Sequence, residues 1–598
     1  MLLINFINKK SIYFVKMFSF VEPNLKKMNF YKFHCQSVLL FIVIILSFIK
    51  CGNYSNNNIS TSTGWKVNDK KGGFTYNTKY GKQQIAPGLV LIEGGTFVRG
   101  KIQDDVMREW VNQPSRQHVQ SFYMDETEVT NFMYTEYLFW IKKVYPPSES
   151  KYTNIYNGLV PDTLVWRNQL GFSETMTNNY LRFPAYADYP VVGVNWVQAN
   201  EFAKWRTNRY NETILESEGF IKRDSPLKDV NAEKTFDTET YLASPTSVYD
   251  GDLSITQGGL SSKKLIKSGR KSDLFVQRKL GILSIEYRLP TESEWEYAAT
   301  ADVGNRVMNN IRGQKRYPWT GSYTRSSKRK KKGDQLANFK QTKGDYGGIA
   351  GWNDDGADIT NKTKSYQAND FGLYDMAGNV AEWVADVYRP IIDDEVSDFN
   401  YFRGNIYLKN KFNPNGKFDI ATLESMQYDT LETGKLLAKT YPGQINKVPV
   451  DQNETYLRAN FDKSDNVNYR DGDVASSRFY KGQTIQKTKI QLEKERMYNS
   501  PINKVLADSL GKIKRENDKT NKRNSLINEK NRVYKGGSWN DRAYWLDPAQ
   551  RRYLHQDKAT NFIGFRCAMS RIGNKADYKK VLRGYKISKY QKKYKNQL

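Results

Sequence analysis

The chain is poor in the residues that build disulfide frameworks and transition-metal centres. Among its 598 residues the cysteines are Cys35, Cys51 and Cys567, and the histidines are His34, His118 and His555. So few thiols exclude a disulfide scaffold and a four-cysteine zinc site. The histidines lie far apart and show no H-x-x-x-H spacing, which argues against a zinc centre or a facial-triad iron centre.

Acidic residues and long apolar runs are also scarce. A mean hydropathy of -0.72 excludes a polytopic membrane protein. The 92 Lys and Arg outnumber the 64 Asp and Glu, so the formal net charge is +28. Such a charge attracts nucleic acid, anionic lipid and acidic polysaccharide, although a general lysine bias produces the same value. Apolar residues at 39% and aromatic residues at 14% are enough for a packed core, which excludes a wholly disordered chain.

An apolar run, Ser37–Ile49, ends just before Cys51 and is followed by a polar stretch at 52–63. The run is too short for a transmembrane helix, which needs about 20 residues, and has the length of a signal-peptide core. It resembles a bacterial lipoprotein signal, in which the cysteine becomes the acylated N-terminus. We therefore predict lipidation at Cys51, a lipid anchor in the membrane and an outer-membrane location. Because Lys50 stands where that motif has a small residue, an uncleaved anchor or an ordinary signal peptide is the alternative.

From Pro87 onward, short strand patterns alternate with amphipathic helix patterns. Leu89–Ile92 and Thr96–Arg99 predict two strands separated by a glycine turn, and Val191–Val194 predicts a buried strand. Few helices in glycine-rich, irregular chain indicate an α+β fold with much loop.

Three predicted helices begin at capping residues. Thr130 precedes apolar residues spaced i, i+3, i+4 and i+7, and Asn195 precedes a second amphipathic segment. Thr291 and Glu294 have the spacing of a capping box.

Two long polar segments interrupt this pattern and are interpreted as insertions rather than as separate domains. The predicted organisation is a signal and lipidation segment at 1–51, a flexible lead-in at 52–86, a core domain at 87–391 and 532–572 with an insertion at 211–284, a large insertion at 392–531, and a basic tail at 573–598.

Basic residues gather in the tail and in the run Arg325–Lys332. Basic segments with interleaved aromatic residues bind nucleic acid or anionic lipid, and a solvated terminus has the same composition. An exported protein meets little nucleic acid. We therefore expect no nucleic-acid partner. If this charge serves binding, we expect the partner to be an anionic polymer of the cell envelope or a protein.

Four motifs follow one another in a characteristic order. They are Gly88–Gly100 (GLVLIEGGTFVRG), Tyr287–Ala299 (YRLPTESEWEYAA), Phe371–Val384 (FGLYDMAGNVAEWV), and Val533–Asn540 (VYKGGSWN) followed by Gly564-Phe565-Arg566. Together they resemble the sulfatase-modifying-factor, or formylglycine-generating enzyme, domain family. The resemblance implies that family's irregular, loop-rich, C-type-lectin-like fold, here with two long insertions.

A narrower resemblance rests on Ser62–Trp65, on Ser121–Asn131 and on the two insertions. These features are similar to gliding-motility lipoproteins of the J type (GldJ-like), with the K type as the near alternative. The resemblance implies a structural component of the gliding-motility and associated protein-secretion machinery. Its partners would be other envelope lipoproteins and proteins of that machinery.

The family's enzymes hold copper with two cysteines that follow the G-G-S segment, and thiolates suit Cu(I). By resemblance those two positions fall on Asp541 and Leu546, and neither carries sulfur. Cys567 follows the G-F-R motif and is expected to be a small core residue. We therefore predict no catalytic residues, no copper and no oxidase activity. The alternatives are a formylglycine-generating-type oxidoreductase acting on a protein or peptide and a carbohydrate-binding envelope protein.

The resemblance also implies two structural calcium sites, built from the oxygen ligands that Ca²⁺ prefers. The first site would use the side chains of Asn338 and Asp355 and the backbone carbonyls of Phe339 and Ala357. The second site would use the side chains of Asp375 and Glu382 and the backbone carbonyls of Gly378 and Val380. The alternative is that these carboxylates only accept hydrogen bonds from nearby backbone.

Two further expectations concern large side chains in the motifs. Arg566 is expected to anchor core carboxylates or carbonyls rather than a substrate. Trp295, Trp383 and Trp539 are expected to pack in the core rather than form a platform for sugars.

Overall fold

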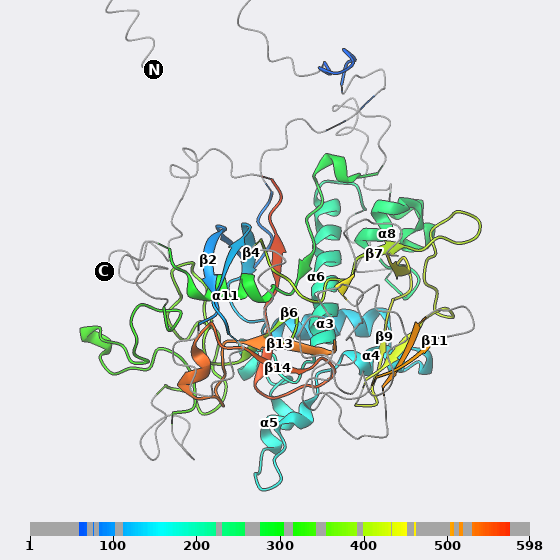
Figure 1. Cartoon of the computed structure of the whole chain (residues 1–598). Coiled ribbons are helices and arrows are strands. Elements are labelled where there is room, and N and C mark those ends of the chain that lie inside the picture. Colours follow the sequence, from blue (N-terminus) through cyan, green and yellow to red (C-terminus); the bar gives the residue numbers. More distant parts are fainter. Residues whose placement is uncertain are drawn as a thin grey trace, which may run out of the picture. The chain divides into compact units, whose positions relative to one another are not determined.

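The computed structural model of the chain (Figure 1) falls into two units, residues 1–79 and 80–598. The residues that the structure describes are 59–67, 74, 76, 83–101, 112–222, 230–256, 275–303, 315–341, 355–390, 399–431, 433–450, 460, 461, 503–507, 513–517 and 529–573. Cys51, the signal segment and the tail beyond 573 lie outside these residues.

In the first unit, the described residues form a small turn. Ile59 and Lys66 make an isolated antiparallel bridge, and the amide of Ser60 donates to the carbonyl of Trp65 at 2.8 Å.

The second unit is built on two four-stranded sheets that join distant parts of the sequence (Figure 1). One sheet is antiparallel, and its order is β1 (Leu89–Ile92), β4 (Phe122–Asp125), β16 (Ala568–Ser570) and β5 (Tyr287–Arg288). The other is mixed, and its order is β14 (Arg552–His555), β13 (Asn531–Lys535), β6 (Ala381–Val387) and β15 (Ile563–Phe565), with β15 and β6 parallel. The antiparallel sheet therefore joins the beginning and the end of the core domain, and the mixed sheet joins the segments on either side of the predicted 392–531 insertion.

The two strands predicted around the glycine turn do not pair with each other. β1 pairs with β4, whereas β2 (Gly95–Arg99) pairs with β3 (Ser115–Val119). Gly94 lies between β1 and β2, and a Cβ built there would be 2.4 Å from the carbonyl oxygen of Val119. Because Gly94 has no side chain, its backbone can lie close to the backbone of Val119. The turn at Gly94 does not join the two strands into a hairpin.

The helix starts predicted from capping residues are confirmed. Thr130 caps α3 (Asn131–Val144), and Asn195 caps α6 (Trp196–Ser217) in a reciprocal capping box with Gln198. Thr291 and Glu294 form the expected box at α11 (Glu292–Thr300).

The remaining elements are short. They are α4 (Ser150–Leu159), η1 (Thr163–Trp166), α5 (Glu174–Asn179), η2 (Pro184–Tyr186), α8 (Thr238–Ala243), η3 (Pro245–Gly251), α9 (Leu253–Thr256), η4 (Arg278–Leu280), η5 (Arg329–Lys331), β7 (Leu408–Asn410), β8 (Tyr428–Thr430), β9 (Leu436–Ala438), β10 (Lys447–Pro449), β11 (Asn503–Ala507), β12 (Ile513–Asn517) and η10 (Ala543–Leu546).

The prediction of a strand at Val191–Val194 is wrong. The segment is buried but belongs to no strand. Its backbone bonds to separate segments: the amide of Val191 donates to the carbonyl of Val129, and that of Gly193 to the carbonyl of Thr560. Continuous burial cannot distinguish such a segment from a strand.

Aromatic residues form much of the core. Trp383 belongs to the large cluster that includes Tyr134, Tyr137 and Phe202 from α3 and α6, whereas Trp295 belongs to a second cluster under β4. Trp539 is buried beside Val380. All three tryptophans are thus core residues, as expected.

Residues of the predicted 211–284 insertion form a separate small core with the end of α6, through Leu215, Phe236, Tyr241 and Tyr249. Among the described residues, no helix has both the length and the apolar character needed to cross a membrane.

Candidate functional site

Asp541, at the first copper position, is held in an ion pair with an arginine. Arg552 donates from Nη1 to Oδ1 at 2.5 Å and from Nη2 to Oδ2 at 2.7 Å, and the hydroxyl of Ser538 donates to Oδ2 at 2.5 Å. The guanidinium also lies 4.4 Å from the ring centroid of Trp545. Both oxygens of the carboxylate therefore already have strong donors.

Leu546, at the second copper position, is fully buried. It packs with Tyr317, Ala337, Phe339 and Ala377 in an apolar cluster. An ion pair and an apolar side chain thus occupy the positions where the family's enzymes have two thiols.

Cys567 is also buried, as expected for a core residue. Burial raises the pKa of its thiol, and the nearby charge of Asp125 raises it further. A protonated thiol is a poor metal ligand. Among the described residues, no three His, Cys, Asp or Glu side chains are arranged to hold a metal ion.

The structure brings the first predicted calcium set together around one carboxylate. Oδ1 of Asp355 accepts from the amide of Ala357 at 3.1 Å, and Oδ2 accepts from the amide of Phe339 at 3.3 Å. Asn338 donates from Nδ2 to the carbonyl of Ile359 at 2.7 Å. The structure thus places Asp355 beside Phe339 and Ala357, through their amides.

In the second predicted set, Glu382 is paired with Arg566. The guanidinium donates to Oε1 at 2.6 Å and to Oε2 at 2.7 Å, and the indole of Trp295 also donates to Oε2. Arg566 further donates to the carbonyls of Asp125 and Tyr374. This confirms the expectation that Arg566 anchors core carboxylates and carbonyls.

Asp375, the other acidic residue of that set, has an unsatisfied oxygen. Its Oδ2 accepts from the amide of Lys364 at 2.9 Å, whereas its buried Oδ1 has no hydrogen-bond partner among the described residues. Burial raises the pKa of Asp375 to about 6, and the charge of Glu382 adds to the shift. A buried carboxylate oxygen with no donor fits a cation ligand.

Glu128 is a third acid at this place, and the sequence reasoning missed it. Its carboxylate accepts from the amide of Val380 at 3.2 Å and from Nδ2 of Asn379 at 2.9 Å. Burial and the charges of Asp375 and Glu382 raise its pKa well above the usual range. In the sequence, Glu128 was marked only by its position in the segment 121–131, which was used for the family resemblance.

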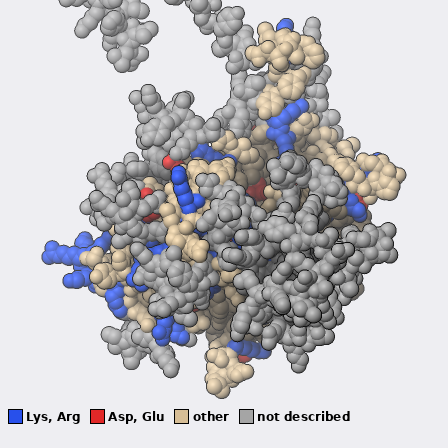
Figure 2. All heavy atoms as spheres, in the orientation of Figure 1, with Lys and Arg blue, Asp and Glu red and all other residues tan. Residues whose placement is uncertain are grey.

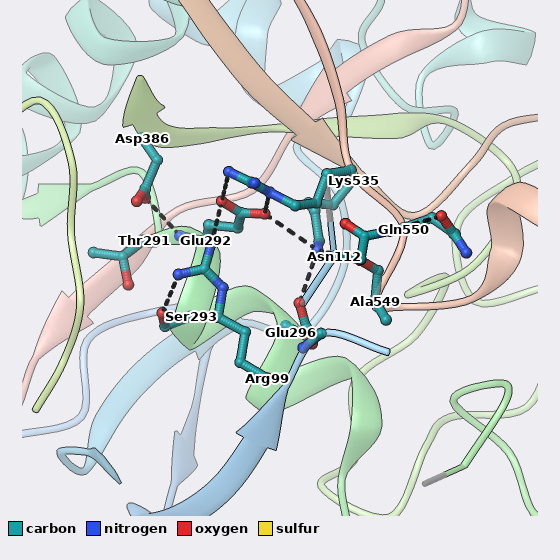
Figure 3. Close-up of polar contacts among 12 residues, drawn as sticks. Arg99, Asn112, Thr291, Glu292, Ser293, Glu296, Asp386, Lys535, Ala549 and Gln550 are labelled. Carbon is teal, nitrogen blue, oxygen red and sulfur yellow. Dashed lines mark hydrogen bonds and ion pairs between the residues drawn. The ribbon is translucent and has the colours of Figure 1, made fainter. Parts of the chain in front are cut away.

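A buried network of charges around Glu292 was also missed (Figure 3). Glu292 accepts from Nη2 of Arg99 at 2.6 Å and from Nε of Arg551 at 2.5 Å, and the ammonium of Lys535 lies 3.4 Å from Oε1. Lys535 also bonds Glu296 at 2.9 Å. The network joins β2, α11 and β13 away from solvent.

The ionisation states in this network follow from its geometry. Burial opposes ionisation of Glu292, but Arg551, Arg99 and Lys535 hold its pKa well below the usual range. Asp386 accepts from the amides of Glu292 and Arg403. Burial and the charge of Glu292 raise the pKa of Asp386 to about 7. Because these side chains are buried, the network braces the fold and does not face a substrate.

A shallow hollow lies between α3 and α6, beside both insertions. Its lining includes Trp140, Trp205, Glu201 and Tyr441. The carboxylate of Glu201 is bonded to Lys204 at 2.7 Å. Arg209, which also lines the hollow, pairs with Glu212, so three of its charged side chains are already in ion pairs.

The model of the sulfatase-modifying factor enzyme 1-like (FGE-sulfatase) domain matches residues 76–428. The chain belongs to this family. The mixed helix and strand architecture of an FGE-like fold is thereby confirmed.

Both active and inactive FGE-like proteins are similar to this chain. Mouse formylglycine-generating enzyme is 33% identical over 99 residues, which are 17% of this chain and 22% of that protein. The mouse protein named inactive C-alpha-formylglycine-generating enzyme 2 is 32% identical over 108 residues, 18% of this chain and 28% of that protein. The chain therefore spans about a quarter of the length of these curated relatives.

Among solved structures, PvdO from Pseudomonas aeruginosa aligns over 81% of this chain and 94% of that one. The identity is 14% and the TM-score is 0.32. The assignment to the FGE-like family rests on the family model and not on this alignment.

Proposed function

We propose that this FGE-like domain is non-catalytic and works by binding other molecules. The observation that carries the proposal is the occupation of both copper positions, by the Asp541–Arg552 ion pair and by the buried side chain of Leu546. The family includes proteins named as inactive, so the fold exists without the activity of its enzymes.

The more specific part of the proposal concerns the cellular location and the biological role of the protein. We propose an outer-membrane lipoprotein anchored through Cys51, which is a structural component of the gliding-motility and associated protein-secretion machinery. The resemblance of Ser62–Trp65 and Ser121–Asn131 to J-type gliding lipoproteins supports this role. Partners would be other envelope lipoproteins and proteins of that machinery. A rigid core with two insertions suits such binding.

Copper loading tests the non-catalytic proposal. We expect the purified full chain to bind no stoichiometric Cu(I) in a competition titration with a chromophoric chelator, because neither Asp541 nor Leu546 supplies a thiolate. An active formylglycine-generating enzyme is the positive control. One tightly bound copper per chain, with oxygen uptake in the presence of a thiol peptide, would contradict the proposal and favour the oxidoreductase alternative.

A separate experiment tests place and role. Mass spectrometry of the mature N-terminus should show acyl chains on Cys51, and in-cell crosslinking should recover envelope lipoproteins and secretion proteins. A Cys51→Ser variant should lose both the acyl mass and those crosslinks. An unmodified N-terminus together with crosslinks to none of these proteins would overturn this part of the proposal.

We also propose that calcium braces the loops around Asp375. The family's calcium would be held by Asp375 and Glu382 with the carbonyls of Gly378 and Val380, and a second ion by Asn338, Asp355 and the carbonyls of Phe339 and Ala357. The unsatisfied buried Oδ1 of Asp375 supports this, as does the excess of buried carboxylates around it. When bound, the ion would supply positive charge beside Asp375 and Glu128, whereas Glu382 is already paired with Arg566.

Removal of calcium should lower the melting temperature. A ligand at 100 times its Kd stabilises a protein by about 2.7 kcal/mol, so EDTA should shift Tm by a few degrees. The shift should become smaller in Asp375→Ala, which removes one of the two sites, and keep its full size in Asp370→Ala, whose carboxylate is half exposed and pairs with Lys315. Identical melting curves for the metal-depleted wild type with added Ca²⁺ and with EDTA would exclude these sites.

A further inference from the structure

A short hairpin at residues 325–335, the basic hairpin, carries a group of cations into solvent. Its base is an antiparallel bridge between Arg325 and Gln335. The amide of Ser326 donates to the carbonyl of Asp334 at 2.8 Å, and that of Gly333 donates to the carbonyl of Ser326 at 3.0 Å. The buried side chains of Ser326 and Gln335 fix this base in the protein. The tip is the single turn η5.

The tip, Arg329–Lys332, consists of four consecutive exposed cations. Among the described residues, none of the four has an ion-pair partner. Figure 2 shows Lys and Arg gathered over this segment at the left edge of the view. Some exposed lysines elsewhere are paired with acids: Lys151 with Glu149, Lys362 with Asp188, Lys411 with Asp419 and Lys439 with Asp429.

The fold itself gains nothing from these four charges. No residue of η5 is buried, so the tip contributes no core packing. Neighbouring like charges in a turn repel, at a cost of a few tenths of a kcal/mol per pair. The hairpin is nevertheless well formed, because Arg325 donates to the carbonyl of Gly333 and Lys328 donates to Gln367. The uncompensated charge is therefore held in a defined place, as a binding surface for an anion would be.

The directions of the side chains favour one kind of anion. A 3₁₀ turn has three residues per turn, so successive side chains point about 120° apart. Arg329, Lys330 and Lys331 therefore point in three directions. A flat membrane can meet only part of such a tip, whereas a flexible polymer can surround it. Three lysines and one arginine suit diffuse attraction to many charges more than bidentate recognition of one group.

An exposed aromatic ring that precedes the base of the hairpin by two residues indicates the chemistry of that polymer. Tyr323 is 81% exposed, and its carbonyl accepts from the indole of Trp319 at 2.8 Å, which fixes the backbone there. The face of an aromatic ring can pack on the CH groups of a sugar. We propose that the basic hairpin binds an anionic polysaccharide, through the charges of Arg329–Lys332 and the ring of Tyr323. The inference holds whether or not the domain is catalytic.

The test uses the purified full chain and a size-defined heparin oligosaccharide as the anionic polysaccharide probe. In the quadruple variant R329Q/K330Q/K331Q/K332Q we expect Kd at 0.15 M salt to rise by about tenfold or more. The slope of log Kd against log salt concentration should fall by up to about one for each cation removed, because each contact releases a counterion. Since the four side chains are exposed, Tm should not change.

Two matched variants remove the same charge elsewhere. K142Q/K151Q/K362Q/K439Q spreads the change over the surface of the core domain and the large insertion, and K579Q/K580Q/K592Q/K593Q places it in the tail. Each should change Kd by less than about threefold. If either variant weakens heparin binding as much as the hairpin variant does, the binding is a general effect of the +28 charge, and the proposal fails.

A third arm separates polysaccharide from other polyanions. Tyr323→Ala should weaken heparin binding several-fold and leave binding of inorganic polyphosphate, which has no sugar, unchanged. Tighter binding to anionic phosphatidylglycerol vesicles or to single-stranded DNA than to heparin, at matched salt and with the same dependence on the four cations, would overturn the proposal in favour of a membrane or nucleic-acid partner.

Discussion

Replacing Glu292 with glutamine is expected to lower the free energy of unfolding by roughly 3–5 kcal/mol. The carboxylate is fully buried and is contacted by three cations, Arg99, Arg551 and Lys535. A neutral amide of the same size leaves the cavity filled but removes the charge that these cations face. In the variant, Lys535 keeps its ion pair with Glu296 at 2.9 Å, but Arg99 and Arg551 no longer face the charge of residue 292.

The control is the same substitution in an exposed pair. Glu174 bonds Arg167 at 2.7 Å, and the two side chains are 40% and 56% exposed. Solvent screens such a pair, so Glu174→Gln should cost much less stability than Glu292→Gln. Denaturant unfolding curves with unchanged m-values give the comparison. If the two variants lose the same stability, the network around Glu292 is not a brace.

The network bears on the loop that carries Asp541 because of where Lys535 lies. This residue ends β13, and Gly536, Gly537 and Ser538 follow it directly. The hydroxyl of Ser538 then donates to Asp541. The buried charges therefore fix the strand from which the Asp541 loop starts. We expect the network to support the site's shape without any part in chemistry.

Local signals in the sequence were sufficient for the features that depend on neighbouring residues. The caps at Thr130, Asn195 and Thr291 were predicted because a cap needs only three or four residues. The burial of Trp295 and Trp383 was expected because large aromatic side chains contribute much of the apolar area of a core. The family resemblance added the positions of Asp541 and Leu546, which composition and periodicity cannot supply.

Features that depend on distant pairing were not predictable in this way. Glu292 and Arg99 are 193 positions apart, and charged residues on a short helix usually face solvent. Glu128 contacts Val380 across 252 positions, so nothing local marked it as part of the calcium-like cluster. The segment Val191–Val194 has a strand's apolar pattern, but its hydrogen bonds go to separate segments.

Replacing Gly378 with alanine is the second substitution with a large expected effect, roughly 4 kcal/mol or more. Gly378 has a φ of +78°, which costs an alanine about 1–2 kcal/mol. In addition, a Cβ at this position would lie 2.3 Å from the carbonyl oxygen of Asn338. Backbone cannot withdraw as a flexible side chain can, so the two loops must separate.

The substitution Gly416→Ala distinguishes the cost of the positive φ from the cost of the close contact with Asn338. Gly416 has a similar φ of +74°, but a Cβ there meets no described atom within 4 Å. Gly416→Ala should therefore show only the conformational cost, and the difference from Gly378→Ala measures the close approach to Asn338. Equal losses in denaturant unfolding would mean that the approach is not required. Because the carbonyl of Asn338 also accepts from the amide of Asn379 at 2.9 Å, separating the loops breaks that bond as well. The two proposed calcium sets meet at this contact, so Gly378→Ala should also abolish the effect of EDTA on Tm, whereas Gly416→Ala should retain it.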